Sequence, residues 1–186
     1  MLFLSATANL SDNIRSFRPL DTVESPSEYT FNLMCTHCRE MHDSKVTINQ
    51  FEKHSMSGSR GEASFVVKCK FCGNESSINL QRTEEDLYNF NHESTGDLVQ
   101  KTKELRKKQG IKGIKEDQAL LLALDCRGCE PTALDVSNLT FVIELTSGKT
   151  MECTLDDEDL EWYDYDEDAG EEVSVTEAKF GFIKAK

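Results

Sequence analysis

The sequence predicts a mostly β protein in which two strand-rich segments flank one charged segment. Short runs of alternating apolar and polar residues occur over residues 1–82 and again over residues 119–186. A period of two is typical of half-buried strands. Between these segments, over residues 83–118, β-branched residues are scarce and charges are dense, which predicts a linker or surface insertion.

The strands of the first segment follow from this alternation. Apolar residues occupy every second position from Leu2 to Leu10, and Tyr29, Phe31 and Leu33 repeat the pattern. Shorter runs at 45–51, 63–68 and 76–80 have the same strand-like character. We therefore expect residues 1–82 to form one β lobe.

The charged segment contains one predicted helix, over residues 97–109, which ends at Gly110. Seven basic residues face a single acidic one, Glu104, between residues 101 and 115. Charge runs of this kind are usually solvated helices and loops. The alternatives are an anionic partner or the chain's own acidic segment.

The last segment returns to strands. Residues 119–124 form a continuous apolar run, typical of a strand buried on both faces, although a helical turn of this length is an alternative. Alternating residues over 139–145 and 151–155 predict a hairpin that turns at Ser147-Gly148. Two short runs, at 173–175 and 180–183, add closing strands. A weak similarity between residues 66–72 and 123–129 suggests two related lobes, which we expect to pack as one unit.

Composition excludes several classes of protein. The 186 residues carry a net charge of -13, which repels a phosphate backbone and disfavours nucleic-acid binding. No apolar stretch approaches the roughly 20 residues of a membrane span, and the first ten residues lack the pattern of a secretory signal. Seven cysteines without such a signal indicate a reducing compartment. We expect a cytoplasmic or nuclear location.

Four of the cysteines have the spacing of a zinc site. Cys35 and Cys38 form one C-x2-C pair, Cys69 and Cys72 form another, and 30 residues separate the two pairs. Each pair spans a tight turn that presents two thiolates, and Gly73 suits the left-handed position of the second turn. We predict one structural Zn²⁺ held by these four residues, with redox-active thiols or another metal as alternatives.

The 30 residues between the pairs need a structure of their own. We expect the strands at 45–51 and 63–68 to pair as a hairpin whose ends carry the two cysteine turns and whose flexible tip spans residues 55–61.

The remaining cysteines and the histidines do not complete a second site. Cys126 and Cys129 have ligand spacing without a further pair, so we expect a turn at the end of a buried strand, with a redox pair or a transient metal site as alternatives. Cys153 alternates with apolar residues and is expected to be a small buried side chain. His37 is expected to point away from the metal, and His42 is a weaker substitute ligand. Motifs of zinc proteases, nucleotide-binding loops and serine hydrolases are missing, so we predict no enzyme.

The segment 156–172 is strongly acidic, with eleven carboxylates around Trp162, Tyr163 and Tyr165. A solvated loop is one interpretation. A docking surface is the alternative, because aromatic side chains supply apolar contact area and carboxylates attract a basic partner.

Five short motifs follow one another along the chain, at residues 35–38, 59–64, 69–72, 125–131 and 162–167. Together they resemble the eukaryotic CXXC-motif-containing zinc-binding protein family. The two cysteine pairs match its zinc ligands, and residues 59–64, Ser-Arg-Gly-Glu-Ala-Ser, resemble its stretch before the second pair. Residues 125–131 resemble its Cys-Arg-Gly-x-Glu-Pro motif, and residues 162–167 resemble its Trp-x-Asp-Tyr-Asp-Glu motif. The resemblance implies an all-β fold of two similar barrel-like or sandwich-like lobes, with zinc in the first lobe only. It implies no catalytic activity.

These observations together predict a zinc-binding protein without enzymatic activity that acts as a protein-interaction or adaptor module. Thiol-disulfide redox chemistry and metal delivery through the C-x2-C pairs are the alternative functions. We expect the protein to be a monomer with a protein partner and no association with membranes or nucleic acid.

Overall fold

The computed structural model describes the chain except for residues 58–60, 90–91, 157 and 186. Its fold is mostly β, as the sequence predicts, with one α-helix, α1, at Gly96–Lys108 after a short 3-10 turn at Glu93–Thr95. The strands are β1 Leu2–Leu10, β2 Ile14–Pro19, β3 Tyr29–Cys35, β4 Val46–Ile48, β5 His54–Ser55, β6 Glu62–Ala63, β7 Phe65–Lys68, β8 Glu75–Arg82, β9 Leu87–Tyr88, β10 Ala119–Arg127, β11 Cys129–Asp135, β12 Thr140–Leu145, β13 Thr150–Thr154, β14 Trp162–Asp166 and β15 Glu171–Lys184.

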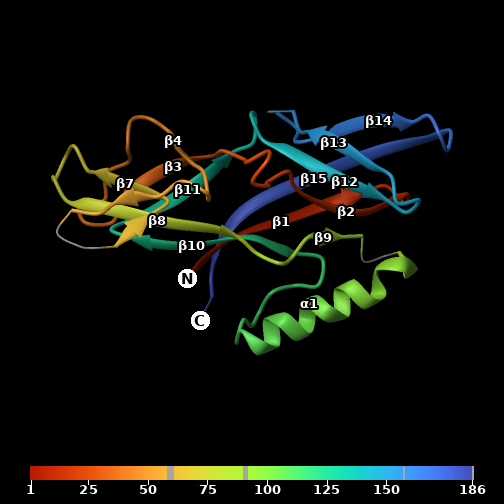
Figure 1. Ribbon diagram of the computed structural model, residues 1–186, viewed down its shortest axis with the longest axis horizontal. Coiled ribbons are helices and arrows are strands. Elements are labelled where there is room, and N and C mark those ends of the chain that lie inside the picture. Colours follow the sequence, from red (N-terminus) through yellow and green to blue (C-terminus); the bar gives the residue numbers. More distant parts are fainter. Residues whose placement is uncertain (58–60, 90–91, 157, 186) are drawn as a thin grey trace.

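A six-stranded sheet forms the centre of the molecule, in the order β14-β15-β1-β10-β8-β7. The first and last strands of the chain, β1 and β15, lie side by side along its middle (Figure 1). Both faces of β1 are buried from Leu2 to Ala6, because the sheet is covered on both sides there. The alternation in the sequence therefore locates this strand but understates its burial.

Besides the short pair of β5 with β6, two smaller sheets lie at opposite ends of the molecule (Figure 1). One has the order β11-β3-β4 and the other β13-β12-β2-β9. Each joins strands from 1–82 with strands from 119–186, since β11 pairs with β3 and β12 pairs with β2. The two sequence intervals therefore share their sheets, and a division into two similar lobes at residues 82 and 119 stays a prediction.

Several predicted strands are confirmed, but one predicted pairing is wrong. The hairpin of β12 and β13 has the expected turn, and the run at 119–124 is the buried strand β10. The segments at 45–51 and 63–68 do not pair with each other: β4 pairs with β3, and β7 pairs with β8. The alternating pattern shows which face of a strand is buried, but it does not show which strand pairs with it. The expected tip at 55–61 lies partly outside the described residues.

The core joins the sheets through apolar side chains from distant segments. Phe141 of β12 stacks on Phe17 of β2, with ring centroids 4.4 Å apart, and approaches Phe180 of β15 at 5.8 Å.

No helix in the described part of the chain is long and apolar enough to cross a membrane.

The charged segment 83–118 is more than a solvated linker. α1 forms almost where predicted and lies beneath β9 and β10 (Figure 1). Arg106 of α1 is buried and binds the buried Glu85 through two of its nitrogens, with Nη2 at 2.6 Å from Oε1. Glu85 also accepts the Leu120 backbone N–H at 3.1 Å. This ion pair fastens the helix to the start of β10.

Candidate metal centre

The first cysteine pair forms a tight turn at the end of β3. The backbone N–H of Cys35 donates to the Glu40 carbonyl, and the N–H of Arg39 donates to the Cys35 carbonyl, both at 2.9 Å. Arg39 has a φ of 66°, in the left-handed region. The turn presents Cys35 and Cys38 on one side. Cys35 is the last residue of β3, and its side chain is buried.

The second pair repeats this geometry after β7. The N–H of Cys69 donates to the Asn74 carbonyl at 2.9 Å, and the N–H of Gly73 donates to the Cys69 carbonyl at 2.8 Å. Gly73 has a φ of 76°, which confirms the left-handed conformation expected from the sequence. The two turns are therefore equivalent zinc-knuckle structures, built on strands of two different sheets.

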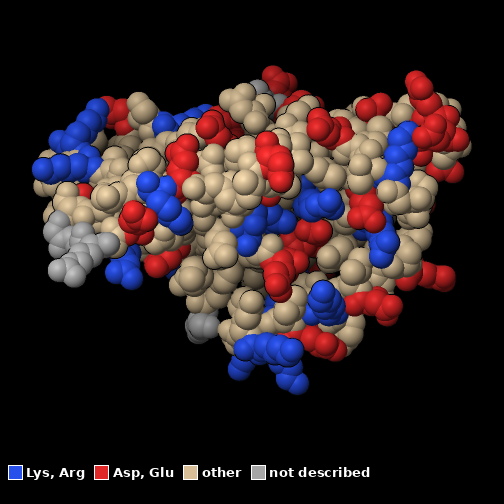
Figure 2. Space-filling view, in the orientation of Figure 1, with Lys and Arg blue, Asp and Glu red and all other residues tan. Residues whose placement is uncertain are grey.

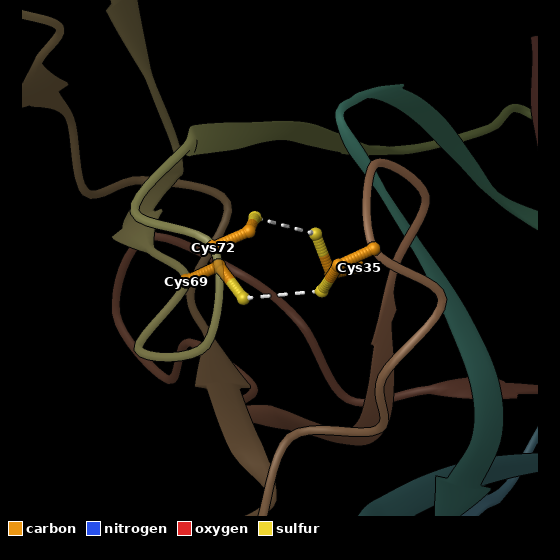
Figure 3. A group of neighbouring side chains, drawn as sticks. Cys35, Cys69 and Cys72 are labelled. Carbon is orange, nitrogen blue, oxygen red and sulfur yellow. Dashed lines mark hydrogen bonds between the residues drawn. The ribbon is translucent and has the colours of Figure 1, made fainter.

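The four sulfur atoms face one another across the gap between the turns (Figure 3). Cys35 Sγ lies 3.7 Å from Cys72 Sγ, and Cys38 Sγ lies 3.8 Å from Cys69 Sγ. All four atoms are within 4.8 Å of one another. Four sulfurs bound tetrahedrally at roughly 2.3 Å from zinc would be about 3.8 Å apart, so the spacing fits a single zinc ion. A disulfide needs about 2.05 Å, so the cysteines are not paired by oxidation.

The surroundings of the cluster favour thiolates on one side. The backbone N–H and the side-chain amide of Asn74 hydrogen-bond to Cys72 and lower the pKa of that thiol to about 6. The amide nitrogen lies 3.3 Å from the sulfur. Cys35 and Cys69 are buried, whereas Cys38 is half-buried and Cys72 is exposed. The cluster is therefore buried at Cys35 and Cys69 and reaches the solvent at Cys72.

The third C-x2-C sequence supports this centre without joining the cluster. Gly128 lies between β10 and β11 with a φ of 79°. Its carbonyl accepts hydrogen bonds from the Thr36 backbone N–H, inside the first turn, at 3.0 Å and from Ser76 Oγ at 2.9 Å. Next to it, Cys129 stands opposite Cys35 in the pairing of β11 with β3. The turn that the sequence predicts here is confirmed, and it braces the first cysteine turn.

Sequence reasoning missed this bracing role, because it depends on contacts between residues far apart in the chain. The only signal was the Cys-Arg-Gly motif itself, which marks a glycine without showing what approaches it. Thr36, Asn74 and Ser76 gave no signal.

Substituting Gly128 by alanine should weaken the centre. A Cβ atom would lie 2.8 Å from Ser76 Oγ and 3.0 Å from His37 Nε2, at a φ that costs a non-glycine residue about 1–2 kcal/mol. With the overpacking, we expect a total loss of about 2–4 kcal/mol and faster loss of zinc to a chelator. Thermal unfolding and a chelator assay measure the two effects.

Gly148→Ala is the matched control for Gly128→Ala. Gly148 has a φ of 90° in the β12–β13 turn, and a Cβ atom there meets nothing within 4 Å. This variant should lose only the conformational part of the stability, about 1–2 kcal/mol, and keep its zinc. Equal zinc loss in both variants would show that Gly128 does not brace the centre.

The other candidate side chains are not brought to the cluster. Among the residues that the structure describes, the four cysteines are the only group of three or more potential ligands. His37 lies against Gly128, and His42 has a buried Nε2 without a hydrogen-bond partner. Neither histidine is part of the cluster. Cys153 is buried in β13, as expected.

The acidic segment forms the edge strand β14 and the turn into β15. Tyr163 and Tyr165 are exposed, and Asp166 is buried beside Lys149, with 3.0 Å between Nζ and Oδ1. Hydrogen bonding to Lys149 lowers the pKa of Asp166. The segment is therefore ordered in part as a strand, and its role as a docking surface stays a prediction.

Comparisons with known proteins agree with this geometry. A family profile described as "CXXC motif containing zinc binding protein, eukaryotic" matches residues 3–183. The chain is 46% identical over 185 residues to UPF0587 protein YCR090C of Saccharomyces cerevisiae, covering 100% of this chain and 99% of the relative. It is 26% identical over 173 residues to the human CXXC motif containing zinc binding protein, covering 93% and 92% of the two chains.

Two solved structures have the same fold. "Crystal Structure of C1orf123" has a TM-score of 0.73 and 26% identity and covers 99% of each chain. A hypothetical protein from Plasmodium falciparum has a TM-score of 0.71 and 19% identity over 98% of each chain, a likeness in fold alone.

Proposed function

The chain belongs to the eukaryotic family of CXXC motif containing zinc binding proteins, and from this premise we propose that its four-cysteine cluster holds one structural zinc ion in a non-enzymatic adaptor protein. The observation that carries the proposal is the convergence of four sulfur atoms at tetrahedral spacing. Four thiolates fill the coordination sphere of zinc and leave no position for water or substrate. Such a site contributes folding energy and supplies no catalytic position.

The cluster spans segments that are distant in the sequence, which supports a structural role. Cys35 belongs to the β11-β3-β4 sheet, whereas Cys69 follows β7 of the six-stranded sheet. A metal between them would tie these two sheets together. Zinc analysis of the purified protein should give one zinc ion per chain, and a metal-free protein with unchanged thermal stability would contradict the proposal.

A redox role is disfavoured for the three thiols that lie outside the cluster. Burial raises the pKa of Cys126, Cys129 and Cys153 to about 12. At pH 7 only about one in 10⁵ such thiols is ionised, whereas attack on a disulfide needs the thiolate.

Alkylation by iodoacetamide at pH 7, mapped residue by residue with mass spectrometry, should therefore be slow at these three cysteines. A raised pKa keeps the thiolate scarce until high pH, so the rate should rise about tenfold per pH unit between pH 7 and 10. The chain unfolded in guanidinium is the control and should react at least about a hundredfold faster at pH 7. Rapid reaction of folded Cys126 at pH 7 would instead favour the redox function.

Metal delivery is a second candidate, because Cys72 is exposed and an incoming chelator or acceptor can reach its sulfur. The two functions differ in what happens when zinc leaves. A delivery protein should release zinc to a weak chelator within minutes and stay folded, whereas a structural site should release it slowly and lose secondary structure. Parallel measurement of zinc transfer and circular dichroism separates them.

A further inference from the structure

We propose that α1 and the loop that follows it form a docking surface for an acidic protein segment that carries large apolar side chains. The inference rests on the proposed function, since it specifies the chemistry of the adaptor's partner. We call this area the basic surface and define it by the exposed side chains of five lysines, Lys101, Lys107, Lys108, Lys112 and Lys115.

The ammonium groups of these lysines have no ion-pair partner among the residues that the structure describes. Of the seven basic residues at 101–115, Arg106 is buried against Glu85, and Lys103 pairs with Glu116. None of the other five makes an ion pair in the part of the chain that the structure describes. The single acidic residue in the run, Glu104, accepts a hydrogen bond from Gln100 at 3.3 Å. Within the described residues, five lysines therefore remain outside any ion pair, against one carboxylate in the run, Glu104 of α1.

Stabilisation of the helix dipole accounts for only part of this positive charge. Lys107 and Lys108 lie in the last turn of α1, where positive charge is favourable beside the negative end of the helix dipole. Lys101 lies in the middle of the helix, and Lys112 and Lys115 lie in the loop, beyond the reach of that effect. In a chain of net charge -13, a concentrated positive area points to a negatively charged partner.

A groove of mixed apolar and polar lining borders α1 near the lysines. It has a volume of about 560 Å³ and runs between α1 and the central sheet. Phe3, Ala123, Leu105 and Ile111 supply its apolar side, and Gln81, Arg82, Thr83, Glu84, Glu85 and Gln109 supply its polar side. Ile111 also borders a hollow of about 330 Å³ that Lys107 and Lys112 frame. Figure 2 shows a group of blue side chains on the lower edge of the molecule, over the region of α1 in Figure 1. Apolar lining next to free lysines suits a segment with both carboxylates and large apolar side chains.

The same features argue for a protein segment over a nucleic acid. A short acidic segment would touch the basic surface alone, whereas a longer polyanion would meet the acidic remainder of the molecule, such as the red side chains at the end where β14 turns into β15 (Figure 2). Phosphates also gain nothing from the apolar side of the groove. Carboxylates would steer the segment to the lysines, and its apolar side chains would fill the groove.

The test uses the full-length, zinc-loaded protein and three fluorescein-labelled probes in fluorescence anisotropy. The probes are a short peptide of Glu, Leu and Phe, the same peptide with Ser in place of Leu and Phe, and an oligothymidine of equal charge. The first peptide should bind most tightly, and its affinity should fall steeply between about 0.1 M and about 1 M salt. The double variant Lys101→Glu and Lys108→Glu should weaken binding at least about tenfold.

The control variant Lys53→Glu and Lys179→Glu changes the net charge equally, at exposed lysines away from α1, and should change the affinity less than about twofold. Equal losses in the two double variants, tighter binding of oligothymidine, or no binding of the first peptide at about 1 mM would each overturn the docking surface. Both variants should keep one zinc ion per chain. Absence of zinc from the unmodified protein would instead contradict the proposed function. The peptide measurements would then still decide whether the docking surface exists.

Discussion

Replacing Cys69 by serine should remove the zinc ion and unfold the region around the four-cysteine cluster. Cys69 is buried, and its sulfur lies 3.8 Å from that of Cys38. Zinc bound in small structural sites contributes roughly 10–16 kcal/mol of apparent binding free energy, comparable with the whole stability of a domain. A loss of only about 5 kcal/mol would lower the Tm by roughly 10–20 °C in a chain of this size.

Thermal unfolding by circular dichroism and zinc analysis measure the two effects of Cys69→Ser. Cys153→Ser is the matched control, because Cys153 is equally buried but lies outside the cluster. It should lose about 1–3 kcal/mol through its buried hydroxyl and keep its zinc. Full zinc occupancy in Cys69→Ser would remove this residue from the ligand set.

Replacing Arg106 by alanine should detach α1 from the sheets. The substitution leaves the Glu85 carboxylate buried without its counter-charge, and it frees the Lys115 and Gln118 carbonyls that accept from the guanidinium. Breaking a buried ion pair from one side costs about 3–5 kcal/mol. Hydrogen exchange of residues 96–118 should accelerate, and the Tm should fall.

Two controls separate the buried pair from charge in general. Lys103 lies on the same helix as Arg106, and Lys103→Ala breaks its exposed pair with Glu116 of the following loop, which should cost at most about 1 kcal/mol. The double variant Glu85→Gln and Arg106→Met removes both charges and should recover a large part of the stability lost by Arg106→Ala. If the double variant is as unstable as Arg106→Ala, the uncompensated carboxylate is not the cause.

The candidate site follows largely from the sequence, since each C-x2-C pair encodes its own tight turn. The local hydrogen bonds of Cys35 and Cys69 lie within a few residues, and Gly73 signals the left-handed position. The convergence of the two turns follows from the preference of zinc for four ligands. Local pattern and ligand chemistry were therefore sufficient.

Features that depend on distant contacts could not be predicted. The predicted partner of β4 was wrong, because an alternating pattern is compatible with several partner strands; β4 pairs with β3. Gly128 braces the first turn across the sheet, and one of seven similar basic residues, Arg106, is buried against Glu85. No local pattern distinguishes that arginine from the exposed lysines around it.

X-ray absorption at the zinc edge, on the purified zinc-loaded protein, tests the central claim most directly. A closed structural site predicts four sulfur neighbours at about 2.3 Å and no nitrogen or oxygen in the first coordination shell. A spectrum with an oxygen or nitrogen ligand, or with fewer than four sulfurs, would contradict a zinc ion enclosed by Cys35, Cys38, Cys69 and Cys72.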